Sequence, residues 1–341
     1  MKATDPLDHE TLARQVKLQR RLAWDMDRDI PWHLGVDPGK PFLPLDDQAI
    51  AFPGASPEQA LALSQYMGLV VNATISEMED ALPKLKQAGW ARLLDDYPVG
   101  PELRELGELF FDEEAKHANA FSRYLDQFCE ATAVERRDLD ALLPKAFGSF
   151  FQKAIINNAE HGGHAFWWVV ANVEEVSIGI FHQIMRHRQA VDPLFFALHK
   201  RHLEEESRHG NYAFLMLNLV ARKPPSLRDR LHRKVDFLVS QIASAPWVVT
   251  ELYKFFDVRR LRGVHPFFDT LASCIPLYES MSRAEIVRRM FFAAPYVSWV
   301  LNPSWREQHV DTARVHGAIV PPLPKPHAVE LSLPHALRTS A

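Results

Sequence analysis

Apolar residues recur along most of the chain at the three- and four-residue spacing of helices that bury one face. Between residues 58 and 223 there are only five prolines, so long helices can continue there without losing backbone hydrogen bonds. No alternating run of apolar and polar residues is long enough to indicate a β-sheet. The pattern predicts an all-α fold with helices at about 56–86, 100–132, 136–155, 160–190, 193–221, 226–257, 264–275 and 282–299.

Helix start signals and prolines suggest where the chain divides. Residues 56–59, Ser-Pro-Glu-Gln, combine an N-cap, a proline at the first helical position and the glutamine of a capping box. Prolines crowd the chain before residue 58 and after residue 320, which predicts extended arms at both ends. The expected parts are an N-terminal arm (1–55), one helical domain (56–300, with its core at 56–221 and accessory helices at 226–299) and a proline-rich tail (301–341).

Composition narrows the class of protein. The net charge of −4 provides no overall basic field, so we expect neither nucleic acid nor a membrane as a partner. Two cysteines are too few for a disulfide framework or a cysteine-rich zinc module. The first ten residues lack the apolar core of a signal peptide, and the longest apolar stretch ends at Glu174. We therefore expect a cytoplasmic protein.

Two segments place a glutamate three residues before a histidine: Glu114-x-x-His117 and Glu206-x-x-His209. Residues three apart share one face of a helix, so each pair can bind a single metal ion. One pair alone is weak evidence, because charged helix surfaces contain it by chance. Both pairs here lie within apolar stripes, where ionised groups are unfavourable unless they are paired or bound to a metal. Metal binding is the simplest explanation for two such cases.

A dinuclear metal site in a four-helix bundle needs one more carboxylate from each of the other two helices. In the first helix, Glu79 shares its face with several apolar residues, which favours it over Glu77. The third helix offers Glu174 and Glu175, and helical periodicity does not decide between them. His202 lies four residues before Glu206, on the same stripe, which makes it a further candidate ligand.

The ordered set of candidates resembles the bacterial diiron arylamine N-oxygenases of the p-aminobenzoate N-oxygenase and chloramphenicol-pathway type. The residues that carry the resemblance are Glu79, Glu114, His117, Glu175, His202, Glu206 and His209. The resemblance covers residues 56–221, and the extra histidine at His202 is its most specific feature. Similar ligand spacing, rather than periodicity, favours Glu175 over Glu174.

The resemblance implies a ferritin-like four-helix bundle in which these seven residues bind two iron ions, or manganese in their place. Four glutamates and three neutral imidazoles balance two divalent ions. It further implies that dioxygen, bound as a peroxo-diferric species, oxygenates the nitrogen of a small-molecule amine, most simply an aromatic one. No flavin or nicotinamide motif occurs, so an external electron donor is expected. The additional helices are compatible with a homodimer.

Other classes share the double Glu-x-x-His pattern. Ribonucleotide reductase small subunits place a radical tyrosine four residues after the first histidine, where this chain has Phe121, although Tyr124 follows one turn later. A diiron hydroxylase or desaturase acting on an acyl chain or another small molecule remains open, because pocket shape selects the substrate. A rubrerythrin-like peroxidase or a ferritin-like storage protein is the alternative outside the oxygenases.

Overall fold

The computed structural model describes residues 7–44, 54–97, 99–145, 147–222, 224, 226–237, 240 and 254–280, with only the backbone of residues 175, 176 and 183. This part of the chain contains helices and no strand, which confirms the all-α prediction. None of its helices is long and apolar enough to cross a membrane.

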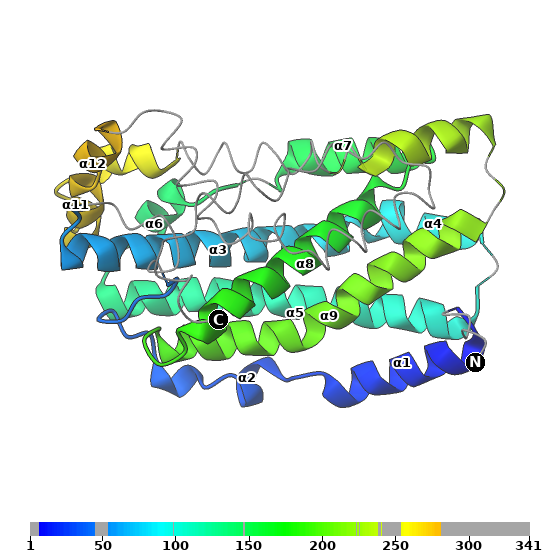
Figure 1. Ribbon diagram of the computed structural model, residues 1–341, viewed down its shortest axis with the longest axis horizontal. Coiled ribbons are helices and arrows are strands. Elements are labelled where there is room, and N and C mark those ends of the chain that lie inside the picture. Colours follow the sequence, from blue (N-terminus) through cyan, green and yellow to red (C-terminus); the bar gives the residue numbers. More distant parts are fainter. Residues whose placement is uncertain are drawn as a thin grey trace, which may run out of the picture.

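Four long helices dominate the structure (Figure 1). They are α3 (Pro57–Lys86), α5 (Pro101–Thr132), α8 (Ala165–Arg186) and α9 (Pro193–Arg222). Helix α3 packs along α5 and α8 packs along α9, while α5 also contacts α9 and joins the two pairs. The sequence predicted each of these helices, and the ends of α3, α5 and α9 agree with the prediction to within one residue.

The predicted capping box at the start of α3 is confirmed. The Gln59 amide N–H donates to Ser56 Oγ at 3.2 Å, and the Ser56 amide N–H donates back to Gln59 Oε1 at 2.9 Å. Near its other end α3 contains Pro83, which has no N–H to donate to the carbonyl of Glu79 four residues earlier. A π-helical turn (Gln87–Ala91) and the short α4 (Arg92–Asp95) follow.

The predicted extended N-terminal arm is wrong for residues 9–22, which form helix α1 (His9–Leu22). The Asp8 carboxylate caps this helix by accepting the Thr11 amide N–H at 2.9 Å. Helix α1 packs against α5 and α9. The prediction treated residues 1–57 as one proline-rich segment. Six of its prolines lie between residues 31 and 57, after the end of α1. Helix α2 (Met26–Asp29) and a 3-10 turn (Trp32–Leu34) come next.

Residues 35–44 are anchored to the long helices by Asp192, the residue before α9. Its Oδ2 accepts the Asp37 amide N–H at 2.9 Å, and its amide N–H donates to the Pro41 carbonyl at 2.8 Å. Phe42 then packs on α3 at Gly68, where a Cβ would lie only 2.5 Å from the Phe42 Cβ. The close approach therefore requires glycine at that position.

The remaining helices differ from the predicted ones at their boundaries. The expected helix 136–155 is divided into α6 (Arg136–Leu142) and α7 (Ser149–Glu160), with Pro144 and Gly148 between them. Helix α8 begins later than expected because Gly162 has a positive φ of 85°. Of the expected 226–257 helix, residues 227–237, 240 and 254 are helical. Residues 255–257 belong to a 3-10 helix (Phe255–Leu261). Helices α11 (Pro266–Ser273) and α12 (Ile275–Glu279) replace the expected 264–275 helix. The expected 282–299 helix and the 301–341 tail lie outside the described residues.

The buried apolar residues form two clusters, one toward each end of the four long helices. On α3 the first cluster ends at Ile75 and the second begins at Met78. On α5 the second cluster ends at Phe111 and the first resumes at Ala120. The gap between the clusters falls at the same level on α8 and α9. A layer of buried polar residues fills this gap.

Candidate metal centre

The polar layer contains seven glutamates and histidines whose side chains converge between the four long helices. Each side chain is at most 2% exposed. They are Glu79 on α3, Glu114 and His117 on α5, Glu174 on α8, and His202, Glu206 and His209 on α9. The structure therefore brings together six of the seven residues predicted from the sequence, with Glu174 as the seventh member.

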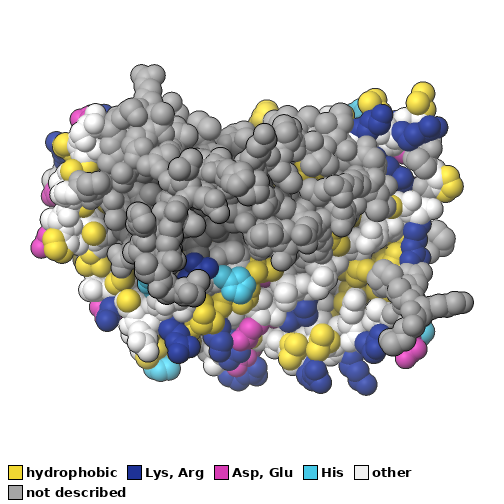
Figure 2. All heavy atoms as spheres, viewed as in Figure 1, with side chains coloured by type: hydrophobic (Ala, Val, Ile, Leu, Met, Phe, Trp, Pro, Cys, Tyr) yellow, Lys and Arg dark blue, Asp and Glu magenta, His cyan; other side chains and the backbone are white. Residues whose placement is uncertain are grey.

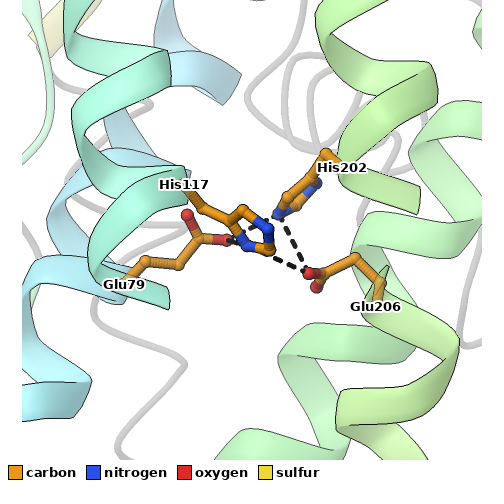
Figure 3. Close-up of side chains that lie close together, drawn as sticks. All are labelled: Glu79, His117, His202 and Glu206. Carbon is orange, nitrogen blue, oxygen red and sulfur yellow. Dashed lines mark hydrogen bonds and ion pairs between the residues drawn. The ribbon is translucent and has the colours of Figure 1, made fainter. Parts of the chain in front are cut away.

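One group of ligand atoms joins α3, α5 and α9 (Figure 3). His202 Nε2 lies 2.6 Å from Glu79 Oε1 and 3.2 Å from Glu206 Oε1. His117 Nδ1 approaches the same carboxylates, at 3.4 Å from Glu206 Oε1 and 3.9 Å from Glu79 Oε1. One atom from each of these four residues lies within 4.8 Å of the others, close enough to hold one metal ion.

Two further groups overlap with the first. His209 Nδ1 lies 2.9 Å from Glu114 Oε1 and 3.3 Å from Glu206 Oε1. Glu114, His117 and His209 form one group, and Glu174, Glu206 and His209 form the other, each within 4.8 Å. Each pair of groups has one residue in common, which is His117, Glu206 or His209. The three groups therefore make one continuous cluster that can hold metal ions.

The third-helix carboxylate in this cluster is Glu174. Its side chain is fully buried, and its Cβ lies 3.5 Å from the position a Cβ would take at Gly210 on α9. The side chain of Glu175, which the family resemblance favoured, lies outside the described residues. Its role as a ligand therefore stays a prediction.

Substitution can decide between the two glutamates. We expect Glu174→Ala to lower the amount of bound metal, because the variant loses a carboxylate from the group with Glu206 and His209. Glu175→Ala is the matched control, with the same change one position along α8, and it should keep its metal. Metal analysis of both purified variants measures the difference. Metal loss in Glu175→Ala alone would instead restore the choice based on family spacing.

Unsatisfied polar atoms show that the cluster fits a bound cation. Among the described residues, the following buried atoms have no hydrogen-bond partner: both carboxylate oxygens of Glu174 and Glu206, one oxygen each of Glu79 and Glu114, and Nδ1 of His117. Buried polar atoms in proteins are nearly always hydrogen-bonded. So many converging lone pairs are unfavourable unless a positive charge lies among them.

The pKa values of the carboxylates also show that negative charge is unfavourable in this cluster. Burial, together with the charges of the neighbouring carboxylates, raises the pKa of Glu79 and of Glu174 well above the usual range. Burial raises the pKa of Glu114 to about 7. Without metal, protons therefore take the place that cations would occupy, and metal binding must displace them.

The histidines are divided into two kinds. Burial lowers the pKa of His117 and of His202 to about 3, so both imidazoles are neutral at pH 7, the form that binds metal ions. For His209, burial acts in the same direction, but the carboxylates of Glu114 and Glu113 outweigh it and raise its pKa well above the usual range. A metal ion at Nδ1 of His209 would replace that proton.

Two glutamates next to the ligands, Glu113 and Glu205, were missed in the sequence. His209 Nε2 donates to Glu113 Oε2 at 2.8 Å, and His117 Nε2 donates to Glu205 Oε2 at 2.6 Å. These bonds hold the proton on Nε2 of each ring and leave the Nδ1 lone pair facing the cluster. Each glutamate precedes a ligand glutamate in a repeated Glu-Glu-x-x-His sequence and contacts the histidine of the other repeat. The repeated first glutamate was the available signal.

Loss of one of these outer carboxylates should weaken metal binding. We expect Glu205→Gln to lower metal affinity by about 10- to 100-fold, because the hydrogen bond to His117 loses its charged acceptor. Glu204→Gln is the control, because Glu204 is partly exposed and forms an ion pair with Arg201 instead. Competition with a coloured chelator measures both affinities. Equal affinities for the two variants would contradict a role for Glu205 in orienting the ligand.

The fold and the site together define an all-α protein with a buried cluster of glutamates and histidines that can hold metal ions. No family model, no curated protein and no solved structure matches the chain.

Proposed function

We propose that this chain is a ferritin-like diiron oxygenase that uses dioxygen to oxygenate the nitrogen of a small aromatic amine. The observation that carries the proposal is the set of four carboxylates and three imidazoles from four helices, buried between two apolar clusters. Seven side chains, several with two oxygens to offer, exceed what a single six-coordinate ion takes, and four negative charges balance two divalent ions.

The donor atoms favour iron. Oxygen and imidazole donors without thiolate suit iron or manganese better than a structural zinc ion. Bound iron would supply the reducing electrons and open coordination positions that dioxygen activation requires. The residues of the chain would hold the ions; burial keeps His117 and His202 neutral, and the apolar clusters on both sides exclude bulk water.

The assignment to amine nitrogen rests on the family resemblance and on the third histidine. His202 gives the cluster one imidazole more than the two Glu-x-x-His pairs supply, and its Nε2 contacts both Glu79 and Glu206. A radical-storing role has less support. Phe121 packs edge-on against the ring of His202 at 4.8 Å, and the Tyr124 hydroxyl donates to Asp192 at 3.1 Å.

The decisive experiment loads the protein with ferrous iron and exposes it to oxygen with single substrates. The panel contains arylamines, aliphatic amines, fatty acids and hydrogen peroxide, and products are identified by mass spectrometry. We expect N-oxidised arylamines from the wild type and none from Glu206→Ala, which lacks a carboxylate present in two of the three groups. Hydroxylated fatty acids without N-oxidation would select the hydroxylase alternative. Rapid peroxide consumption alone would select the peroxidase.

A further inference from the structure

A pocket of about 370 Å³ opens beside the metal cluster, between the end of α1 and the exposed side of α9. Its lining includes Trp24, Arg21, Arg201 and Arg208. Trp24 itself is only 5% exposed. The pocket therefore leads from the surface to a residue that is otherwise buried.

Trp24 connects this pocket to a ligand of the cluster by two routes. Its indole stacks on the imidazole of His117, with ring centroids 5.4 Å apart and planes inclined by 11°. Its amide N–H donates to Glu205 Oε1 at 3.1 Å, and Glu205 Oε2 accepts His117 Nε2 at 2.6 Å. His117 belongs to two of the three ligand groups, so it is well placed to deliver an electron to the cluster.

Packing alone does not explain why this residue is tryptophan. Within the described part of the chain, the buried Trp24 Nε1 has no hydrogen-bond partner. Leaving an N–H group buried and unpaired is unfavourable, because the group loses its hydrogen bonds to water. Phenylalanine would stack on His117 without that penalty. What tryptophan adds is a larger and more polarisable π-system between the pocket and the ligand.

The ammonium group of Lys116 lies over the Trp24 ring and makes oxidation of the ring unfavourable. Lys116 Nζ lies 4.0 Å from the centroid of the Trp24 ring and is held there by Glu205 at 2.7 Å. An ammonium over the ring face disfavours loss of an electron from the ring, because a second positive charge would form beside the first. The ring is therefore suited to pass an electron inward as a bridge and not to become oxidised itself.

The surface around the pocket carries unbalanced positive charge. The two carboxylates that line the pocket have cationic partners: Asp29 pairs with Arg28 at 2.8 Å, and Glu204 pairs with Arg201 at 2.8 Å. By contrast, exposed Lys17 and Arg21 on α1 form no ion pair within the described part of the chain. Figure 2 shows Lys and Arg side chains, interspersed with Asp and Glu, along the lower edge, where Figure 1 places α1 and α2.

We propose that an acidic one-electron carrier protein docks on this basic surface and that its electrons reach the metal cluster through Trp24 and His117. This inference rests on the proposed function, because it needs redox-active iron. Each transfer oxidises the reduced carrier by one electron and reduces one Fe(III) to Fe(II), so two transfers are needed per site. Trp24 returns to its starting state after each transfer.

The docking surface is tested on the metal-free protein, so that this test does not depend on iron chemistry. The probe is a plant-type [2Fe–2S] ferredoxin, an acidic one-electron carrier, with basic cytochrome c as the comparison. We expect the double variant Lys17→Glu/Arg21→Glu to bind ferredoxin about tenfold more weakly, because like charges now face each other. Arg137→Glu/Lys153→Glu changes the net charge equally on α6 and α7, across the molecule from α1, and should bind normally. Equal weakening by both variants, or tighter binding of cytochrome c than of ferredoxin, would overturn the docking proposal.

The electron route is tested by stopped-flow reduction of the ferric protein, once with reduced ferredoxin and once with dithionite. We expect Trp24→Leu to lose ferredoxin-driven reduction while it keeps ferredoxin binding and dithionite-driven reduction. Trp24→Phe retains an aromatic stack, so it checks folding and should keep part of the ferredoxin-driven rate. An unchanged ferredoxin-driven rate in Trp24→Leu overturns the route and leaves the proposed function intact. Failure of dithionite to reduce the wild type would remove the proposed function and this inference together.

Discussion

Ferrous iron should raise the melting temperature of the metal-free protein by several degrees. Metal ions take the place of the bound protons and remove the mutual repulsion among the four buried carboxylates. They also bind the unpaired oxygens of Glu114, Glu174 and Glu206. At a free metal concentration about 1,000 times the dissociation constant, binding adds about 4 kcal/mol to the free energy of unfolding. Differential scanning calorimetry under anaerobic conditions measures the shift.

Glu206→Gln provides the control for this stabilisation. The side chain keeps its size, but it loses the charge that lies near both His202 and His209. We expect iron to raise the melting temperature of this variant much less than that of the wild type. An equal rise in both proteins would place the metal somewhere other than the buried cluster.

The metal-free protein should lose stability as the pH rises from about 6.5 through the raised pKa values of the buried carboxylates. Glu114, with a pKa of about 7, and Glu79 and Glu174, with pKa values raised further, hold protons in the folded state that the unfolded chain has released. A group with a raised folded pKa stabilises the fold below its unfolded pKa, and this contribution is lost as the pH passes the folded pKa. His209 acts in the same direction.

The two histidines with lowered pKa do not oppose this trend. His117 and His202, with folded pKa values of about 3, contribute stability above the unfolded value of about 6.5 that is lost only on acidification. Urea unfolding of the metal-free protein at three pH values measures the trend. Glu79→Gln, which is neutral at every pH, should flatten it. Rising stability across this range would show that the carboxylates are already ionised, which contradicts the inferred protonation.

Six of the cluster residues could be predicted because of one physical conflict in the sequence. Glu79, Glu114 and His202 are polar residues in stripes that otherwise face an apolar interior, and such residues need a partner. Helical periodicity then places the members of each pair on one side. The structure brings these residues together in the gap between the two apolar clusters.

The same reasoning could not choose between Glu174 and Glu175, because α8 is apolar around most of its circumference near this point. Trp167, Trp168 and Val170 point in different directions and are all at most 1% exposed. When no face is polar, periodicity does not show which side faces the neighbouring helices. Contacts between helices decide the matter, and they are not present in a single helix sequence.

Glu113 and Glu205 were missed for a different reason. Each lies in a run of acidic residues, 112–114 and 204–206, which resembles a solvated helix surface. Their burial depends on segments distant in the sequence. Gln19 on α1 donates to Glu113 at 2.8 Å, and the backbone of Trp24 donates to Glu205 at 3.1 Å. Proline content predicts an extended arm for these N-terminal residues, so nothing in the pattern places them against α5 and α9.

In each Glu-Glu-x-x-His repeat the first glutamate binds the histidine of the other repeat. This exchange relates α5 and α9 by a local pseudo-twofold axis, but their outer contacts differ. On one side Glu113 is bound by the neutral amide of Gln19, and on the other Glu205 is bound by the Lys116 ammonium. The ammonium neutralises the carboxylate behind His117, so Glu205 draws less strongly on its ring proton than Glu113 does on that of His209. His209 is thus the stronger electron donor of the two imidazoles, and two metal ions held here would be electronically inequivalent even with identical first ligands.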